Sequence, residues 1–537
     1  MTTENYDFVI VGAGPGGCAL AGRLAQMRPD TKIALIEAGP RKSNPIVDAP
    51  LGIAIITPTK SARNYAYETV PQKQLNNRRG FQPRGRGVGG SSLINAMIYI
   101  RGQHEDYDSW AHEQGCNGWG WSDVLPYFKR AEHNERGADE YHGADGPLNV
   151  ADLRSPNPVA EAFVKAALQA GYTHNSDFNG AVQEGFGMYQ VTQKSGHRFN
   201  ASYAYLTDST PNVAVLADAQ ALRIIFNGKR ATGVEIEQAG TRKIIAASAE
   251  VIVACGAFGS PQLLLCSGIG PAAHLKEAGV DVVFDSPEVG ENLQDHIDYT
   301  INRKVKDKSL FGTDLRMVVD ATKAFIEYNR DGHGMFTTNV AESGGFYKSS
   351  DDLTRPDIQV HFCTGLVVDH GRRKLMARGL SVHTCVLRPK SRGTVKIANG
   401  DMRNVPLIDP NFLDHPDDLQ TLIRGVNKAV EILAQEAMRP YHGLGLDGAT
   451  GAETGEALIP LIREHADTIY HPVGTCRMGS DDRAVVDAQL RVRGVEGLRI
   501  ADASIMPSLI SGNTQAPSSM IGERAADFIR QSNTPPH

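Results

Sequence analysis

Residues 7–39, DFVIVGAGPGGCALAGRLAQMRPDTKIALIEAG, constrain the fold more than any other stretch of the chain. An apolar run leads into Gly12, Gly14 and Gly17, which fit the pattern G-x-G-x-x-G, and Glu37 follows the last glycine by about 20 residues. The first glycine permits a tight turn, the second lets a pyrophosphate approach the backbone, and the third allows close packing of helix on strand. The helix N-terminus can then hold phosphates while Glu37 accepts hydrogen bonds from ribose hydroxyls. The stretch predicts a strand–helix–strand unit that binds a dinucleotide.

This unit alone does not distinguish NAD from FAD, because both cofactors use it. Near the C-terminus, GLRIADASIMPS forms a second short apolar strand that ends in Asp502. In the segment LISGNTQAPSSMIGERAADFIRQ that follows, Thr514 and Pro517 are typical of a helix start. A carboxylate and a helix N-terminus from the far end of the chain suit a long cofactor held at several points. The helix dipole could also stabilise the negative charge of a reduced flavin, so we favour FAD.

A glycine-rich stretch, PRGRGVGGSSLINAMIYIRG, occupies residues 83–102. Its glycines at 85, 87, 89 and 90 remove side chains, so that the backbone can approach something flat or charged. No lysine follows them, so the stretch is not a phosphate loop of the G-x-x-x-x-G-K-[ST] type. It fits either a structural turn or a loop that lies against a ligand, and we favour the ligand loop.

The composition of the 537-residue chain is that of an ordinary water-soluble protein. Hydrophobic residues make up 41% and charged residues 22%, and 55 basic against 61 acidic side chains give a net charge of −6. This balance argues against a nucleic-acid-binding surface, and the length predicts about two or three structural units. The seven cysteines lack the paired spacing of metal ligands, so we expect no metal site and a reducing, cytoplasmic compartment.

No uninterrupted apolar run reaches the roughly 20 residues that a transmembrane helix needs, since residues 251–275 are broken by Pro261. A strand-like run begins at Tyr6 and leaves no room for a signal peptide, so we expect the mature chain to start near Met1. A weaker membrane association stays open on one helix-like segment. Its apolar face fits either core packing or peripheral membrane contact, and it carries Leu315, Val318, Val319, Phe325 and Ile326 beside Arg316 and Lys323.

Several blocks of sequence resemble the glucose–methanol–choline (GMC) family of flavin oxidoreductases. They are PRGRGVGGSSLIN, GAFGSPQLLLCSGIG, VGENLQDH, HPVGTCRMG and ADASIMP, and they follow the family order over nearly the whole chain. Within the family, NPIVDAPLGIA, NVAESGGF and YQVTQKSGHRFNASYAYL are most similar to the bacterial alcohol dehydrogenases of alkane degradation. Those are peripheral membrane enzymes that oxidise aliphatic primary alcohols and pass electrons to a quinone. Choline dehydrogenases and polyethylene-glycol dehydrogenases are near neighbours.

The resemblance implies an α/β (α+β) fold with two domains. A Rossmann-like FAD-binding domain would comprise residues 1–155, 211–302 and 466–537, and a substrate domain built on an antiparallel sheet would comprise residues 156–210 and 303–465. Strand-like runs and turns between residues 228 and 257 fit a β-meander attached to the nucleotide fold.

The resemblance also implies the residues that hold the cofactor. They are Gly12, Gly14, Gly17, Glu37, Arg84, Val88, Gly89, Gly90, Ser92, Asn95, Ala221, Asp502, Ala503 and Thr514. Some members attach the flavin through a histidine at the position that Ile94 occupies here, so we expect noncovalent FAD. Gln515 and Ser518 also depart from the usual asparagine and threonine of the family.

His471 is the candidate catalytic base. Taken alone, a histidine in TIYHPVGTCRMG is more often a hydrogen-bonded core residue. Oxidation of an alcohol by hydride transfer, however, requires a base beside the flavin that takes the hydroxyl proton, and histidine titrates near neutral pH. By the resemblance, this base is His471, and Asn513 is the group that hydrogen-bonds the substrate oxygen.

Other residues are weaker candidates. Tyr470 and Glu342 could line the substrate pocket, although Glu342 could equally pair with a nearby cation. His296 is expected to have a structural role near the cofactor. The aromatic residues of GWGWSDVLPYF are expected to pack in a flap over the cofactor, and they are Trp119, Trp121, Tyr127 and Phe128.

The expected function is oxidation of a primary, aliphatic alcohol to an aldehyde, with hydride transfer to flavin N5 and electrons passed to a quinone. An oxidase that uses O2, a choline or polyethylene-glycol dehydrogenase, an NAD-dependent dehydrogenase, a flavin-containing lyase and a flavin protein without turnover are the rival interpretations. The expected location is cytoplasmic, with peripheral association to the inner membrane left open.

Overall fold

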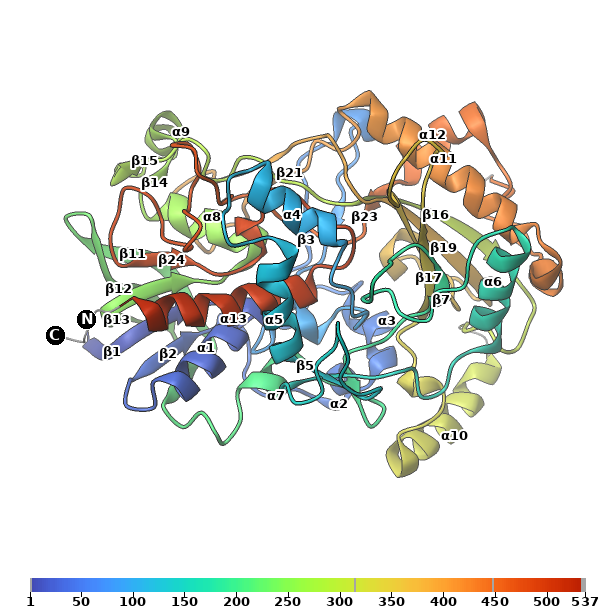
Figure 1. The fold of residues 1–537 in the computed structure, drawn as a ribbon, viewed down its shortest axis with the longest axis horizontal. Coiled ribbons are helices and arrows are strands. Elements are labelled where there is room, and N and C mark those ends of the chain that lie inside the picture. The colour runs from blue at the N-terminus through green and yellow to red at the C-terminus, as the bar shows by residue number, and fades with distance from the viewer. Residues whose placement is uncertain (1, 313–314, 447–448, 533–537) are drawn as a thin grey trace.

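The computed structural model describes residues 2–312, 315–446 and 449–532, and for part of the helix that follows residue 314 it describes the backbone alone. Two seven-stranded sheets lie toward opposite ends of the long axis of the molecule (Figure 1). This arrangement confirms the mixed α/β fold class that the sequence predicts.

The first sheet is built on the predicted dinucleotide unit. Its strand order is β10-β2-β1-β13-β12-β11, and β24 pairs with β13. The pairs that join β10, β2, β1, β13 and β24 are parallel, while β11 and β12 form an antiparallel meander with β13. The strands are β1 Thr2–Val11, β2 Ile33–Ile36, β10 Val213–Leu216, β11 Ala219–Asn227, β12 Arg230–Gln238, β13 Thr241–Val253 and β24 Leu498–Ile500.

Two helices from opposite ends of the chain pack on this sheet. Helix α1 (Pro15–Met27) lies against α13 (Gln515–Gln531), and α13 crosses the sheet beside it (Figure 1). The apolar run Phe8–Val11 at the end of β1 is buried, which places the start of α1 at the carboxyl edge of the sheet. Ligands of parallel α/β sheets bind at this edge.

The second sheet is antiparallel throughout, with the order β22-β16-β19-β18-β17-β7 and with β23 paired to β16. One face carries apolar side chains that pack against α6 (Pro158–Gln169), α11 (Pro416–Leu433) and α12 (Leu458–His465). The strands are β7 Gly185–Met188, β16 Ile297–Lys304, β17 Ala341–Tyr347, β18 Ile358–Cys363, β19 Gly379–Val386, β22 Leu444–Gly445 and β23 Asp467–Thr468.

The domain boundaries stay a prediction, but the sheets show where the chain crosses between them. Strand β16 begins at residue 297 and belongs to the second sheet, although the predicted FAD-binding segment extends to residue 302. Strand β23, at residues 467–468, also joins the second sheet. Both crossings bring the neighbourhood of His471 and His296 to the junction of the sheets.

Shorter elements complete the described chain. The remaining helices are α2 Pro45–Asp48, α3 Ile53–Ile56, α4 His104–His112, α5 Trp121–Ala131, α7 Ala201–Tyr205, α8 Gly256–Cys266, α9 Ala272–Glu277 and α10 Leu315–Asp331. The two-stranded pairs are β3 (Tyr67–Glu68) with β4 (Phe81–Gln82), β5 (Glu132–Asn134) with β6 (Leu148–Val150), β8 (Gln193–Lys194) with β9 (His197–Arg198), β14 (Ile269–Gly270) with β15 (Phe284–Asp285), and β20 (Thr394–Lys396) with β21 (Leu407–Asp409).

Helix α10 lies at the periphery (Figure 1). Phe325 and Ile326 on this helix are 51% and 61% exposed, so these two side chains do not show the core packing that was one of the two interpretations of this segment. The side chains of Leu315, Val318 and Val319 lie outside the described part of the structure. None of the helices in the described ranges combines the length and the apolar character that a membrane span requires.

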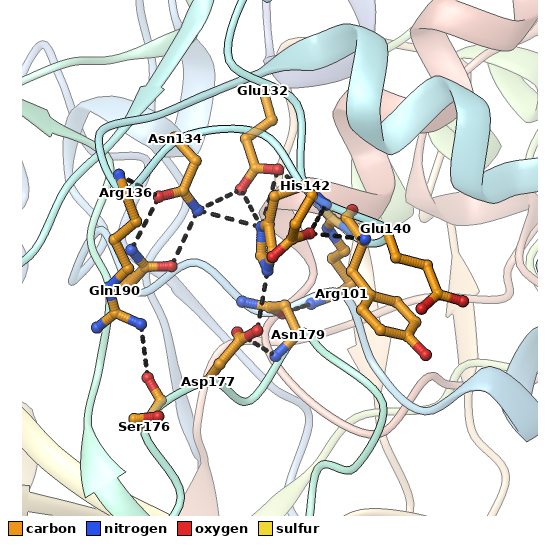
Figure 2. Close-up of polar contacts among 12 residues, drawn as sticks. Arg101, Glu132, Asn134, Arg136, Glu140, His142, Ser176, Asp177, Asn179 and Gln190 are labelled. Carbon is orange, nitrogen blue, oxygen red and sulfur yellow. Dashed lines mark hydrogen bonds and ion pairs between the residues drawn. The ribbon is translucent and has the colours of Figure 1, made fainter.

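A buried network of charged groups connects β5 to the loop that carries Asp177 (Figure 2). The imidazole of His142 lies between two carboxylates, with Nδ1 3.0 Å from Glu132 Oε1 and Nε2 3.0 Å from Asp177 Oδ2. Arg101 forms a second ion pair with Glu132, and both of these side chains are fully buried. Because each ring nitrogen of His142 faces an acceptor, the ring carries both protons.

We expect this network to make the stability of the protein depend on pH. Burial alone would lower the pKa of His142, but the hydrogen bonds to Asp177 and Glu132 outweigh it and raise the pKa to about 9. A histidine whose pKa is raised in the folded state stabilises it fully below about pH 6.5 and loses this contribution as the pH rises through about 9. The contribution is on the order of 3 kcal/mol.

The measurement is the thermal unfolding midpoint across alkaline pH, for the natural chain and for His142→Gln. The midpoint of the natural chain should fall between about pH 7 and about pH 9.5, and that of the variant should change less over the same interval. Parallel curves for the two proteins would contradict the assignment.

Candidate functional site

A cavity of about 980 Å³ is lined by residues of both sheets. Its volume is at the upper end of the range of small-molecule and cofactor sites. Gly12, Glu37 and Asp502 line it at the edge of the first sheet, and His361 and His383 line it on the second.

The start of α1 has the geometry that a phosphate group requires. At Gly12, where φ is +103°, a Cβ would lie 2.3 Å from the carbonyl oxygen of Ala254, and at Gly17 it would lie 1.9 Å from the oxygen of Gly12. At Gly14, by contrast, a Cβ would meet nothing within 4 Å, because this residue faces the cavity. No side chain caps the N-terminus of α1, so its first amide groups stay available to a ligand.

Glu37 is fixed by three backbone amides at the end of β2. Its carboxylate accepts hydrogen bonds from Ala13 N at 3.1 Å, from Gly39 N at 2.9 Å and from Gly87 N at 2.9 Å. A carboxylate has about four acceptor positions, so one is left for a ribose hydroxyl at the cavity wall. Burial raises the pKa of Glu37, and the amides that bond it act in the opposite direction.

The glycine-rich loop packs directly on this nucleotide end, as the sequence suggested. The amide of Gly89 donates to Ala13 O at 2.7 Å, and a Cβ at Gly90 would lie 2.6 Å from Gly14 Cα. Of the residues predicted to contact the cofactor, Arg84, Gly90, Ser92, Asn95 and Ala221 line the cavity. Gly17, Val88 and Gly89 do not line it and instead support the wall from behind.

The C-terminal segment adds a second helix N-terminus to the same cavity. The carboxylate of Asp502 accepts from Gly256 N and Ser504 N, each at 2.8 Å, and from the hydroxyl of Ser260. Ala503 and Thr514 line the cavity, and Thr514 occupies the N-cap of α13 without a side-chain capping bond. Two uncapped helix N-termini, an open glycine and a ribose acceptor in one cavity fit a long cofactor with a pyrophosphate and a ring that becomes anionic.

His471 lies where the second sheet meets this cavity. It is 7% exposed, and its backbone amide donates to Asp295 Oδ1 at 2.8 Å. Its Nδ1 lies 2.9 Å from Nδ1 of His296, and its Nε2 lies 3.0 Å from Nδ2 of Asn513. Asn513 in turn accepts at Oδ1 from Gln359 Nε2 at 3.1 Å.

These contacts define the proton positions on both imidazoles. His296 Nε2 lies 3.0 Å from the carbonyl oxygen of Leu387, which can only accept, so Nε2 carries the hydrogen. Burial lowers the pKa of His296 to about 3, so the ring is neutral and its Nδ1 is an acceptor. His471 must therefore donate from Nδ1 to His296. The lone pair of His471 is left on Nε2, next to Asn513.

The surroundings keep His471 in its basic form. Burial lowers its pKa well below the ordinary value of 6.5, and the neighbouring His296, His361 and Arg84 lower it further. Asn513 uses one amide hydrogen on His471, while Gln359 occupies its oxygen, so a second amide hydrogen can reach a ligand. A hydroxyl that displaces the Asn513 hydrogen from His471 Nε2 would meet this base, with amide hydrogens of Asn513 beside it as donors.

Several predicted residues lie elsewhere. Tyr470 lines the cavity, but Glu342 does not, because its carboxylate is buried where it accepts from Asn157 N at 2.6 Å and from the hydroxyl of Thr338. The predicted aromatic flap is also wrong: none of its four residues lines the cavity. Trp119 and Tyr127 pack on the guanidinium of Arg524 in α13, and Trp119 and Phe128 belong to the core of the first sheet.

Cavity-lining residues of the second sheet were not predicted from the sequence. His361 and Cys363 alternate along β18 and line the cavity, and His361 stands opposite His383 of β19. His361 is 3% exposed, and neither ring nitrogen has a hydrogen-bond partner. Polar residues at every second position of an apolar strand were the signal that could have identified this face.

Comparison with known proteins agrees with this geometry. The chain matches the GMC oxidoreductase family over residues 6–298 and, in its C-terminal part, over residues 389–522. It is 44% identical over 529 residues to an alcohol dehydrogenase [acceptor] of Pseudomonas putida, covering 98% of this chain and 95% of the relative. It is 41% identical over 532 residues to an oxygen-dependent choline dehydrogenase of Rhizobium rhizogenes, covering 97% and 95%.

Solved structures give the same result. Pyridoxine 4-oxidase from Mesorbium loti superposes with a TM-score of 0.88 at 28% identity, covering 99% of this chain and all of that one (100%). Formate oxidase superposes with a TM-score of 0.91 at 25% identity, covering 99% of each chain. The chain therefore belongs to the GMC oxidoreductase family, and it is an FAD-dependent oxidoreductase that acts on CH–OH donors.

Proposed function

We propose that this protein is a dehydrogenase that oxidises uncharged, aliphatic primary alcohols to aldehydes, with His471 as the catalytic base. The observation that carries the proposal is the lone pair of His471 Nε2, which the contact with His296 directs toward Asn513 at the cavity. The similarity to the Pseudomonas alcohol dehydrogenase supports the reaction class.

FAD supplies the hydride acceptor when it is bound, and the residues of this chain manage the hydroxyl proton. His471 Nε2 takes this proton, and the second amide hydrogen of Asn513 donates to the substrate oxygen as negative charge develops there. The carbinol carbon loses a hydride, the oxygen loses a proton, and an aldehyde remains. The resulting imidazolium of His471 keeps its Nδ1 hydrogen bond to His296, and the carboxylate of Asp295 continues to accept the His471 backbone amide.

The chemistry of the cavity wall supports an uncharged substrate. Among the described residues that line the cavity, the carboxylates are Glu37 and Asp502, and both are already bonded by backbone amides at the cofactor end. Ile46, Ile55 and Phe325 provide apolar surface where an alkyl chain can lie. A choline dehydrogenase is the second candidate. Choline dehydrogenases match this chain over nearly its whole length at 40–41% identity, against 44% for the Pseudomonas alcohol dehydrogenase.

The test is anaerobic reduction of the bound flavin by an alcohol panel, followed by its visible absorption. We expect linear primary alkanols to bleach the flavin faster than choline, polyethylene glycol or aromatic alcohols. A flavin that stays oxidised with every alcohol would contradict the dehydrogenase and favour the lyase interpretation.

The electron acceptor is proposed to be a quinone. The relative from Pseudomonas is an alcohol dehydrogenase [acceptor], and the oxidases among the similar structures make O2 the alternative. Reoxidation of the reduced protein by a soluble quinone should be faster than reoxidation by air, and the opposite order would make the protein an oxidase.

We also propose a cytoplasmic location with peripheral membrane contact, and the mouth of the cavity supports the membrane contact. Ile46, Ile55 and Phe325 line the cavity and are 47%, 59% and 51% exposed, while Lys60 and Lys374 line it beside them. Exposed apolar residues flanked by cations suit an anionic membrane surface. The protein should sediment with anionic vesicles more than with neutral ones, and Ile55→Ser with Phe325→Ser should reduce sedimentation. Equal recovery in the supernatant for all samples would contradict this contact.

We also propose that FAD is held without a covalent bond. Ile94 lines the cavity and is 4% exposed, and its side chain has no nucleophilic atom that could attach to the flavin. Acid precipitation should therefore release the yellow cofactor into the supernatant. A precipitate that retains the flavin would show that another residue forms the bond.

A further inference from the structure

A third carboxylate lies behind the alcohol end of the cavity. Asp298 is at the start of β16, and its Oδ2 is 2.6 Å from Nδ1 of His383 on the neighbouring β19. The hydroxyl of Thr300 donates to the same oxygen at 3.2 Å. The other oxygen, Oδ1, is buried and has no hydrogen-bond partner.

His383 separates this carboxylate from the cavity. His383 lines the cavity, together with His361 opposite it and Tyr470 nearby, whereas Asp298 does not line it. Burial alone would lower the pKa of His383, but the charge of Asp298 outweighs it and raises the pKa to about 10. The pair is therefore an imidazolium and a carboxylate at neutral pH, and its net charge is zero.

We propose that His383 masks Asp298 and thereby makes the alcohol site reject cationic amino alcohols such as choline. This inference rests on the proposed function, because it concerns which primary alcohols the same site accepts. It names His383 and Asp298 as a pair that determines specificity without taking part in proton removal.

A quaternary ammonium group loses its hydration when it enters a buried cavity, and an unpaired anion that faces it offsets this cost more than aromatic faces alone do. His383 occupies the side of the Asp298 carboxylate that faces the cavity. The ammonium group of a substrate would therefore meet the imidazolium of His383 before it met the carboxylate. Lys60 and Lys374 at the mouth add repulsion. An uncharged alkyl chain meets neither penalty.

Replacement of His383 should expose the carboxylate. In His383→Asn, the smaller, neutral amide leaves Asp298 with its charge and with space on the cavity side. A trimethylammonium group could then pair with a buried carboxylate, which is a stronger interaction than the same pair in water.

The experiment compares choline with its neutral isostere, in which a tert-butyl group replaces the trimethylammonium group. Binding of each to the oxidised holoenzyme is measured by calorimetry, and anaerobic flavin reduction is measured separately. The natural protein should bind the isostere more tightly than choline. In His383→Asn, the ratio of choline affinity to isostere affinity should rise roughly tenfold or more.

The matched control is the double variant His383→Asn with Asp298→Asn, which has the same added space but no carboxylate. In the double variant, the ratio of choline affinity to isostere affinity should return to the value of the natural protein or fall below it. The isostere also reports whether each variant keeps a folded site. A ratio that does not change in His383→Asn, or that rises equally in the double variant, would overturn the inference.

The binding ratio separates this inference from the proposed function. If neither these two compounds nor the linear alkanols reduced the flavin, the alcohol dehydrogenase would be refuted, whereas the affinity ratio would still decide whether His383 masks Asp298. Preference of the natural protein for choline over the isostere would overturn the masking directly.

Discussion

The variant His471→Ala should keep its yellow flavin but reduce it with alcohol about 100 to 10,000 times more slowly than the natural protein, or more slowly still. The expected loss is large because His471 Nε2 is the proposed base. Its lone pair lies beside Asn513 at the cavity. Without it, the alcohol must transfer a hydride before its hydroxyl is deprotonated. Anaerobic stopped-flow absorption measures the rate, and the visible spectrum measures flavin content.

His133 provides the matched control, since it is an exposed histidine that does not line the cavity. His133→Ala should reduce the flavin at the natural rate. Near-normal bleaching in His471→Ala would show that another group is the base, and loss of flavin from this variant would show that His471 acts mainly in cofactor binding.

The pH dependence follows from the environment of His471. Because burial and neighbouring histidines hold its pKa well below 6.5, the ring is a free base over the whole neutral range. A base is active above its pKa, so the rate of flavin reduction should not decline as the pH falls from about 8 to about 6.5. A half-maximal rate near pH 6.5 or above would contradict the assignment of the low pKa to the active protein.

The nucleotide end of the site is the part that sequence reasoning predicts best. Gly12, Gly14 and Gly17 act within a few residues of one another, and each role depends on local geometry that the spacing already specifies. Glu37 is also predictable, because it follows Gly17 at the fixed spacing of the same strand–helix–strand unit. The structure adds what local patterns do not contain, namely that Gly87, from the glycine-rich loop, donates to the Glu37 carboxylate.

The substrate end depends on contacts between distant segments, so most of it was not predictable. His361 and His383 face the cavity because β18 and β19 pair in one register, and a shift of either strand by one residue would turn its histidine toward the core. Glu342 shows the opposite error. It lies on the strand β17 next to the cavity residue Ala341, but its side chain turns toward Asn157 instead. The alternation of polar and apolar residues along a strand predicts that its two faces differ. It does not predict which face of the sheet lines the cavity.

The packing around α13 is a similar case. Trp119 and Tyr127 were expected above the cofactor because they cluster in sequence, yet they surround Arg524 on the helix that approaches from the far end of the chain. They therefore pack against the middle and the second half of α13, whereas the cavity is lined at the other end of this helix, beside Thr514.

Replacement of His296 should slow flavin reduction by roughly 100-fold without release of FAD, although this residue does not line the cavity. In His296→Leu, the hydrogen on His471 Nδ1 loses its acceptor. A buried, unpaired N–H is costly, so the proton shifts toward Nε2, and Nε2 then has no lone pair for the alcohol. The base is still present, but a smaller fraction of molecules holds it in the active tautomer.

His296→Asn separates this tautomer effect from general damage. The amide oxygen of asparagine can take the place of His296 Nδ1 as the acceptor for His471, while leucine cannot. We therefore expect His296→Asn to reduce flavin much faster than His296→Leu, and we expect equal thermal stability and flavin content to exclude unfolding as the cause. Equal rates for the two variants, or a natural rate in His296→Leu, would mean that His471 is held in its active form by contacts other than the one to His296, and the proposed proton assignment would be wrong.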